Sequence, residues 1–345
     1  DRHLFNEAYL MHISTSPQYS IIASCDVAAA MMEPPGGTAL VEESLAEALD
    51  FRRAMRKVDD EFGDDDWWFK VWGPDQLVDE GIGRSTDWVL KRTDSEGVQP
   101  SDGEEAWHGF GDMAPGFNML DPIKATIVTP GLNMDGRFET TGIPASIVTK
   151  FLAEHGVVVE KTGLYSFFIM FTIGITKGRW NTLLTALQQF KDDHARNQPM
   201  WRTMPEFCAK QPRYEQMGLH DLCQHVHALY AKYDIARLTT EMYLSDHLPA
   251  MKPSDAFAHI AHRTTQRVPI DDLEGRITTS LVTPYPPGIP LLIPGEVFNK
   301  KIVDYLKFNR EFARECPGFE TDIHGLVQVA GVDGVMGYFA DCVGA

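Results

Sequence analysis

Three neighbouring hydroxyl side chains stand near the start of the chain, at Ser14, Thr15 and Ser16. They precede a segment that predicts a helix, and hydroxyl and backbone N–H groups ahead of a helix are well suited to bind phosphate oxygens. A simpler role for such a cluster is to cap the helix, because Ser and Thr are preferred N-cap residues. The residue types alone favour capping, so a phosphate ligand needs a further argument.

One carboxylate, Glu160, directly follows a short apolar run, Val157-Val158-Val159, that predicts a strand. A carboxylate at a strand end is commonly a solvated edge residue. A partly desolvated carboxylate, however, pairs well with an ammonium group, because a charge-assisted hydrogen bond is stronger than a neutral one. A cationic substrate is therefore the chemistry that Glu160 could serve.

Side chains of the types that bind metals occur close together at His220, Cys223, His225 and His227. Cys223 and His227 would share one face of a helix, but neither a Cys-x-x-Cys pair nor a His-Glu-x-x-His motif completes a tetrahedral set. The sequence therefore predicts no metal site. It also lacks Gly-x-Ser-x-Gly and Gly-x-x-x-x-Gly-Lys-Ser/Thr, the signatures of α/β-hydrolases and P-loop proteins.

Several long phrases of the sequence resemble one enzyme family. They are FNEAY (5–9) running into HISTSPQY (12–19), HGVVVEKTG (155–163) and PGFETDIHG (317–325). These phrases resemble the bacterial inducible ornithine, lysine and arginine decarboxylases, which use pyridoxal phosphate (PLP) on the aspartate-aminotransferase type of fold (fold type I). The resemblance runs from about Arg2 to the C-terminus and is closest to the lysine decarboxylase branch. It implies conversion of L-lysine into cadaverine and CO₂, with ornithine or arginine as the alternative substrate.

The resemblance also implies roles for particular residues. Ser14, Thr15 and Ser16 are expected to contact the PLP phosphate across a dimer interface, and Glu160 is expected to face the distal ammonium of the substrate. A carboxylate at this position argues against arginine, but lysine and ornithine both end in an ammonium. Lys124 opens a predicted strand, yet the cofactor lysine of the family follows a histidine, so Lys124 is not expected to hold PLP.

The Ser-x-His-Lys motif that carries this lysine in the family does not occur in the sequence. We therefore expect the Schiff-base lysine to lie upstream of Asp1, no catalytic residue within this chain, and no activity of the chain by itself. The implied partners are a basic amino acid, the upstream half of the same enzyme and a second copy in a homodimer or a larger ring. A non-catalytic scaffold or regulatory subunit is the alternative from another class.

The segments that must position these residues predict a mixed α/β chain. Residues 21–32 are small and apolar and predict a buried helix, and a second helix is expected from about Thr38. Residues 59–106 are acidic, Gly-rich and aperiodic, and they predict a surface excursion that is held to the core by Trp67, Trp68, Phe69 and Trp72.

From Lys124 to Phe190 the pattern strand, helix, strand, strand, helix predicts a small two-layer α+β unit, in which Asp121 caps the turn before the first strand. A strand near 276–283 and a last helix over 298–315 are expected further on. With the resemblance, this organisation implies three domains: the end of the PLP-binding major domain (1–33), a small α+β subdomain (34–197) and a C-terminal α+β domain (198–345).

Composition limits the partners and the compartment. The net charge of −18 argues against nucleic acid and anionic membranes as partners. The five cysteines show no paired spacing, which favours a reducing cytoplasm over a disulfide framework. The longest apolar run, 164–175, is shorter than the roughly 20 residues that a membrane-spanning helix needs. We therefore expect a soluble, cytoplasmic protein.

Overall fold

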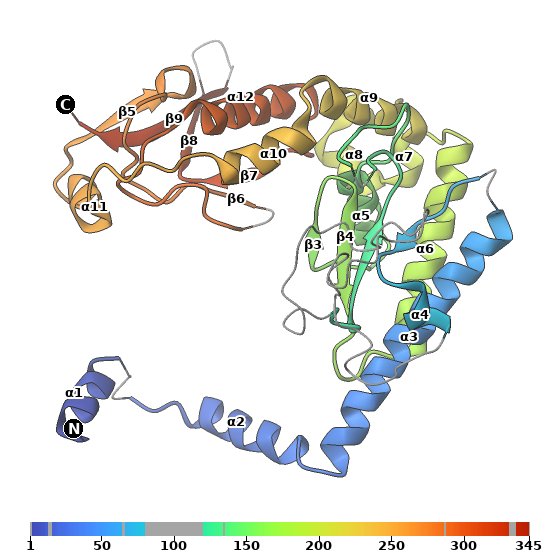
Figure 1. Cartoon of the computed structure of the whole chain (residues 1–345). Coiled ribbons are helices and arrows are strands. Elements are labelled where there is room, and N and C mark those ends of the chain that lie inside the picture. The colour runs from blue at the N-terminus through green and yellow to red at the C-terminus, as the bar shows by residue number, and fades with distance from the viewer. Residues whose placement is uncertain are drawn as a thin grey trace, which may run out of the picture.

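The structure is a computed structural model, and it describes residues 2–12, 16–63, 66–79, 120–133, 135–285, 288–330 and 336–344. It shows an N-terminal arm, a central sheet with helices, and a C-terminal region of helices and short strands (Figure 1). This mixture of helices and strands confirms the predicted α/β class. No helix in the described part of the chain combines the length and the apolar character that a membrane span requires.

The arm consists of α1 (Arg2–His12) and α2 (Tyr19–Met31), and it leads into the long helix α3 (Gly36–Phe62). In Figure 1 the arm extends away from the lower end of α3. The helix predicted over 21–32 is confirmed, but its burial was wrong, because α2 has no buried residue. Its apolar side chains meet no core within the described residues, and composition alone cannot say which unit covers an apolar helix.

An antiparallel sheet lies at the centre, in the strand order β1-β2-β4-β3. The strands are β1 (Lys70–Val71), β2 (Lys124–Val128), β3 (Lys161–Thr162) and β4 (Ser166–Met170). Helices α3 and α5 (Ala145–Glu154) pack with the sheet, and α6 (Lys177–Ala195) packs against both of them. The sequence of elements from β2 to α6 confirms the predicted order strand, helix, strand, strand, helix.

The position of the short strand was wrong, because residues 157–159 are irregular and β3 begins at Lys161. Helix α5 ends at Glu154 and Gly156 follows with a φ of +77°, and the N–H of Val157 still bonds to the Leu152 carbonyl in the last turn of the helix. The chain is therefore completing the helix C-terminus where the apolar run predicted a strand. The side chain of Val158, in the middle of that run, is 88% exposed.

The aromatic segment after α3 lies against the core as predicted. Trp68 and Phe69 are buried, and Trp67 and Trp72 are partly buried. The Phe69 ring packs edge-on against Phe190 of α6, with centroids 6.0 Å apart. A short helix, α4 (Asp75–Asp79), follows this segment. The segment from 80 to 119, which includes most of the predicted excursion, lies outside the described residues.

Short helices dominate the second half of the chain: α7 (Met200–Thr203), α8 (Pro205–Lys210), α9 (Leu219–Lys232), α10 (Ile235–Leu244) and α11 (Pro253–Ala261), with 3₁₀ turns at Pro212–Tyr214 and Ile270–Asp272. The last helix is α12 (Lys300–Glu315), close to its predicted bounds. Phe312 of α12 packs against Tyr230 of α9 with centroids 5.3 Å apart. Tyr230 in turn packs edge-on against Tyr165 with centroids 6.1 Å apart, so these rings join the two halves of the chain.

Two further sheets belong to this half. One has the order β5-β9-β8, and the other pairs β6 with β7. Their strands are β5 (Thr265–Pro269), β6 (Thr283–Tyr285), β7 (Asp322–His324), β8 (Leu326–Ala330) and β9 (Met336–Val343). The strand predicted near 276–283 was largely wrong, because 277, 278 and 282 make only isolated bridges and regular pairing starts at Thr283.

Candidate functional site

The hydroxyl cluster is only partly described by the structure. Ser16 lies exposed in a bend between α1 and α2, whereas Ser14 and Thr15 lie outside the described residues. The N-cap of α2 is Gln18, whose side chain makes no capping hydrogen bond.

Glu160 is exposed and lies immediately before β3, a strand at the edge of the central sheet. Its backbone N–H donates to the carbonyl oxygen of Phe168 on β4, with an N···O distance of 2.9 Å, so its main chain is fixed to the sheet. Within the described residues the carboxylate makes no hydrogen bond or ion pair. The geometry therefore presents an unpaired anionic group on a fixed backbone.

The structure does not bring Ser16 and Glu160 together. Ser16 belongs to the N-terminal arm and Glu160 to the edge of the central sheet, and the two segments are well separated (Figure 1). A site that used both residues of one copy would need a large movement of the arm. Two copies, or two parts of a larger protein, could use them without any such movement.

The potential metal ligands His227 and Cys223 of α9 have structural roles in the core. His227 is buried, and its Nε2 lies 2.9 Å from the Glu139 carbonyl oxygen, which can only accept, so Nε2 carries the proton. Nδ1 then accepts a hydrogen bond from the Tyr165 hydroxyl over 2.6 Å. Burial also raises the pKa of the Cys223 thiol far above its usual range, which disfavours a thiolate ligand.

Among the described residues, no group of three or more His, Cys, Asp or Glu side chains is placed to hold a metal ion. Asp121 has the predicted capping role, because its Oδ1 accepts from the Ile123 N–H at 3.3 Å. Lys124 is exposed and pairs with Asp121 at 3.4 Å. Its position thus gives it a surface ion pair.

A buried lysine that the sequence reasoning missed anchors the segment after α3. Lys191 of α6 donates to Asp66 Oδ1 (2.7 Å) and to the Trp67 carbonyl (2.8 Å), and its ammonium lies 4.4 Å from the ring centroids of Phe62 and Trp67. The four contacts satisfy the buried charge. The acidic run after α3 was visible in the sequence, but its partner is more than a hundred residues away.

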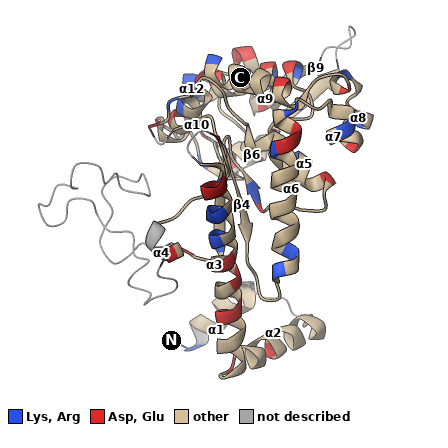
Figure 2. Ribbon diagram, turned by 90° about the vertical axis from the view of Figure 1, so that its right-hand side faces the viewer, with Lys and Arg blue, Asp and Glu red and all other residues tan. Residues whose placement is uncertain are grey.

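Asp66 also borders a surface cavity of about 610 Å³. Among the described residues, the carboxylates at this cavity are those of Asp59, Asp60, Asp66 and Glu139. Lys70 pairs with Asp59 at 3.7 Å, and Lys191 holds the pKa of Asp66 below its usual value, mainly by its hydrogen bond. Lysines therefore balance part of the acidic charge. Figure 2 shows that acidic residues lie at both ends of α3 and basic residues between them.

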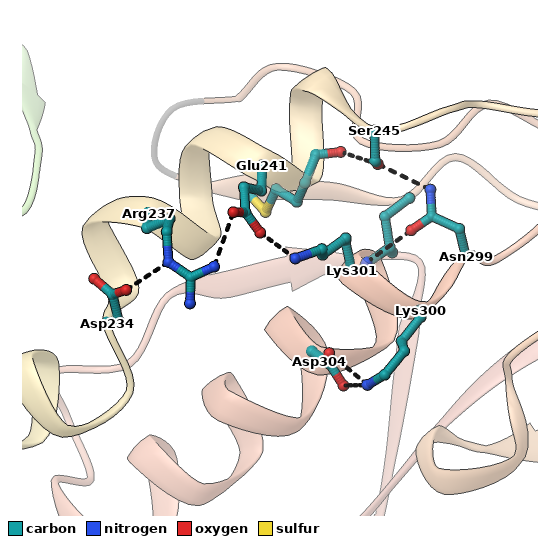
Figure 3. Close-up of polar contacts among 10 residues, drawn as sticks. Asp234, Arg237, Glu241, Ser245, Asn299, Lys300, Lys301 and Asp304 are labelled. Atoms are coloured by element: carbon teal, nitrogen blue, oxygen red, sulfur yellow. Dashed lines mark hydrogen bonds and ion pairs between the residues drawn. The ribbon is translucent and has the colours of Figure 1, made fainter.

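A second polar cluster joins α10 to α12 (Figure 3). Glu241 of α10 accepts hydrogen bonds from Arg237 (2.9 Å) and from Lys301 of α12. Asn299, the N-cap of α12, donates to the Ser245 hydroxyl at 2.9 Å while its Oδ1 accepts from the Ile302 N–H at 3.0 Å. The polar side chains of this cluster are paired with one another, so the cluster holds α10 and α12 together.

Comparison with protein families gives two matches along the chain. The description "Orn/Lys/Arg decarboxylase, major domain" matches residues 1–179, and "Orn/Lys/Arg decarboxylase, C-terminal domain" matches residues 236–344. Together they cover most of the chain and agree with the resemblance of the individual phrases.

Individual relatives agree with these matches. The chain is 47% identical over 98% of its length to lysine decarboxylase LdcA of Pseudomonas aeruginosa, and it spans 44% of that protein. It is 37% identical over 96% of its length to the biodegradative arginine decarboxylase of Escherichia coli, of which it spans 45%. The solved structure of lysine decarboxylase A from Pseudomonas aeruginosa superposes with a TM-score of 0.88 at 47% identity, over 98% of this chain and 44% of that one. The chain thus spans less than half the length of these relatives.

Proposed function

The chain belongs to the Orn/Lys/Arg decarboxylase family, and from this premise we propose that it forms part of a PLP-dependent lysine decarboxylase. The proposed reaction converts L-lysine into cadaverine and CO₂. The observation that carries the choice of substrate is the 47% identity to a lysine decarboxylase over 98% of the chain. PLP, when bound, supplies the electron sink for cleavage of the bond between Cα and the carboxylate.

The residues of the chain fit a contribution to a PLP phosphate site. Ser14, Thr15 and Ser16 would donate hydroxyl hydrogen bonds to phosphate oxygens, and Ser16 is exposed on an arm that extends from the body. None of the lysines in the sequence follows a histidine. We therefore propose that the Schiff-base lysine lies in a segment outside these 345 residues, and that this chain alone is inactive.

Glu160 would recognise the substrate by charge. Its carboxylate has no partner within the described residues. Its backbone N–H donates to the Phe168 carbonyl oxygen, with an N···O distance of 2.9 Å, and this bond fixes the main chain. It would pair with the ε-ammonium of lysine and hold the amino acid in position. Ornithine is the second candidate, because it ends in the same group one methylene closer to Cα.

The arm supports an assembly with more protein than this chain. The α2 side chains of Ile21 and Val27 are each 57% exposed, and no residue of the helix is buried. Exposed apolar area costs about 25 cal/mol per Å², so the helix gains stability when it is covered. We propose that a second copy in a homodimer, or the remainder of the enzyme, covers it. We also propose that the chain is divided into domains at 33/34 and at 197/198, and that the protein is cytoplasmic.

The test is the Glu160→Gln substitution in the complete enzyme, with kcat/KM measured on lysine, ornithine and arginine. We expect a higher KM for lysine and a loss of kcat/KM of about tenfold or more, which corresponds to about 1.4 kcal/mol. Glu215→Gln, at another exposed carboxylate, is the control and should leave kcat/KM unchanged.

Unchanged kinetics of the Glu160→Gln enzyme would remove Glu160 from the substrate site. A parent enzyme that prefers ornithine or arginine would overturn lysine as the substrate. A complete protein that turns over none of the three amino acids would instead favour a scaffold or regulatory subunit.

A further inference from the structure

Glu160 depends for its position on a short strand at the edge of the central sheet. It immediately precedes β3, which consists of Lys161 and Thr162 and lies outermost in the sheet (Figure 1). Within the described residues β3 pairs with β4 alone, so its outer side has no backbone hydrogen bonds to another strand. A strand with so few backbone contacts needs further contacts to be held in one place.

Backbone hydrogen bonds hold the two ends of residues 160–163 to the rest of the hairpin. At one end the Glu160 N–H donates to the Phe168 carbonyl oxygen, with an N···O distance of 2.9 Å. At the other end the Gly163 N–H donates to the Ser166 carbonyl oxygen in the turn, at 2.6 Å. Both bonds join this segment to β4. They do not join it to α5, the helix that packs with this edge of the sheet.

Two threonine hydroxyls join β3 to α5. Thr162 Oγ1 of β3 donates to Thr149 Oγ1 of α5 over 3.3 Å, and the Thr149 hydroxyl donates to the Ser146 carbonyl oxygen one turn earlier in the helix, at 3.4 Å. Both threonines are partly buried. The helix itself is firmly packed, because Ile147 and Phe151 are fully buried. The edge strand is therefore tied through two hydroxyls to a well-anchored helix.

The side chain of Thr162 is well placed to control Glu160. Glu160 and Lys161 are exposed, whereas Thr162 is turned inward and partly buried. The bond from Glu160 to Phe168 continues the pairing of β3 with β4, and residues two apart in a strand share one face. The hydroxyl contact therefore fixes the face of the segment that carries the carboxylate. Both O···O distances are longer than the usual 2.7–2.8 Å of about optimal hydroxyl bonds, so we expect a moderate effect.

We propose that Thr162 is a positioning residue for Glu160. Its hydroxyl, through Thr149, sets the position of the Glu160 carboxylate relative to α5 and thereby its fit to the distal ammonium of the substrate. This inference rests on the proposed role of Glu160. Thr162 acts through Glu160, which would pair with the ammonium before and during the reaction. Loss of the hydroxyl should therefore weaken substrate binding and leave bond cleavage nearly unchanged.

The experiment measures kcat and KM for lysine in the complete enzyme. Thr162→Val keeps the branched side chain and removes the hydroxyl, and it should raise KM about threefold or more while kcat changes less than about twofold. Thr162→Ser keeps a hydroxyl and should restore KM to within about twofold of the parent. The control is Thr182→Val, which removes an exposed hydroxyl bond to the Gly178 carbonyl of α6 (3.2 Å) and should leave KM unchanged.

A double-mutant cycle separates positioning of Glu160 from a general structural role. Independent effects multiply, so a threefold and a tenfold loss of kcat/KM would combine to about thirtyfold. If Thr162 acts through Glu160, the variant with both Glu160→Gln and Thr162→Val should lose no more than Glu160→Gln alone. Thr149→Val removes the same bond from the helix side and should also raise KM. This variant tests the proposal if Thr162→Val does not fold, which urea unfolding reports.

The outcomes distinguish this inference from the proposed function. Unchanged kinetics of Glu160→Gln would remove both Glu160 and its positioning by Thr162. If Glu160→Gln raises KM but neither Thr162→Val nor Thr149→Val does, Glu160 keeps its role and the positioning by Thr162 is wrong. Losses that multiply in the double variant would also overturn the inference, because Thr162 would then act without Glu160.

Discussion

At the scale of single residues, the buried polar groups of this chain are stabilised by specific partners from distant parts of the sequence. The Tyr165 hydroxyl and the Glu139 carbonyl use both ring nitrogens of His227. Tyr165 and His227 also fill the space beside Gly131 and Gly142, where an added Cβ would lie within 2.5 Å and 2.2 Å of their rings. The hydrogen bonds therefore fix the loop between β2 and α5 against α9.

Replacement of Tyr165 by Phe should destabilise the chain. The substitution keeps the buried ring and removes the donor, so the His227 Nδ1 is left buried without a partner. An unsatisfied buried polar atom costs about 1–3 kcal/mol, and the free energy of unfolding measured with urea should fall by that amount. Tyr243→Phe is the control, because its exposed hydroxyl bond to the Ile289 carbonyl (3.2 Å) can be replaced by water. Equal losses in both variants would contradict a special role of the Tyr165 hydroxyl.

Residue types near the start of the chain and at Glu160 were sufficient to suggest ligands for phosphate and ammonium, but not to establish them. The structure places Glu160 exposed and unpaired within the described residues and Ser16 in a bend before α2, and both ligand roles stay predictions. The pairing of Lys191 with Asp66 could not be predicted, because nothing in the sequence links positions 125 residues apart.

At the scale of elements, the start of α12 shows how one side chain serves two helices. Asn299 accepts the Ile302 N–H at 3.0 Å, and its amide nitrogen donates to Ser245 (Figure 3). The same amide nitrogen also donates to the Asp246 carbonyl just after α10. One carboxamide thus caps α12 and ties it to the end of α10.

Asn299→Ala should lower the free energy of unfolding by about 1–2 kcal/mol, because it removes the N-cap and the two bonds to the end of α10. The adjacent Lys300→Ala is a matched control. Within the described part of the chain, Lys300 makes only an exposed pair with Asp304 one turn along the same helix (2.8 Å), so its loss should cost less than about 0.5 kcal/mol. Thermal or urea unfolding of the two variants measures the difference. If Lys300→Ala lowered the free energy of unfolding more than Asn299→Ala, the N-cap would not be the main source of the stabilisation.

Helices were predicted better than strands for a physical reason. The apolar spacing of α6 and α12 repeats over four or more turns, whereas β3 and β6 are so short that a shift of a few residues removes the match. Pairing also depends on partners that are distant in sequence, as when β5 pairs with β9. The apolar α2 was recognised as a helix, but its burial depends on protein that the described residues do not include.

At the scale of the whole molecule, one buried histidine connects stability to pH. His194, in the last turn of α6, lies between the Trp67 and Phe190 rings with centroids 5.5 Å and 6.2 Å away, and 4.9 Å from the ring of His220. Its Nε2 is buried without a hydrogen-bond partner within the described structure. A helix C-terminus would favour the charged imidazolium, but burial outweighs it and, with His220 and Lys191, lowers the pKa from 6.5 to about 4.

The consequence is a loss of stability in mild acid. Between pH 6.5 and about 4, the unfolded chain binds a proton at this position and the folded chain does not. Unfolding therefore takes up a proton, and the free energy of unfolding falls as the pH drops, with an upper limit of about 1.4 kcal/mol per pH unit for one proton. After allowance for solvent screening, we expect His194 to account for about 1 kcal/mol of the stability lost between about pH 6.5 and about pH 5.

His194→Leu should remove this contribution, because leucine is apolar and has no titratable group. Urea unfolding at about pH 7.5 and about pH 5 measures the free energy of unfolding for the parent and the variant, and the variant should lose about 1 kcal/mol less between the two conditions. His225→Leu, at an exposed position on α9, controls for the loss of a histidine as such and should keep the parental dependence. Identical pH dependence in the parent and the His194→Leu variant would mean that the folded chain protonates His194 as readily as the unfolded chain does, and the acid sensitivity would then have to come from carboxylates paired in the folded chain.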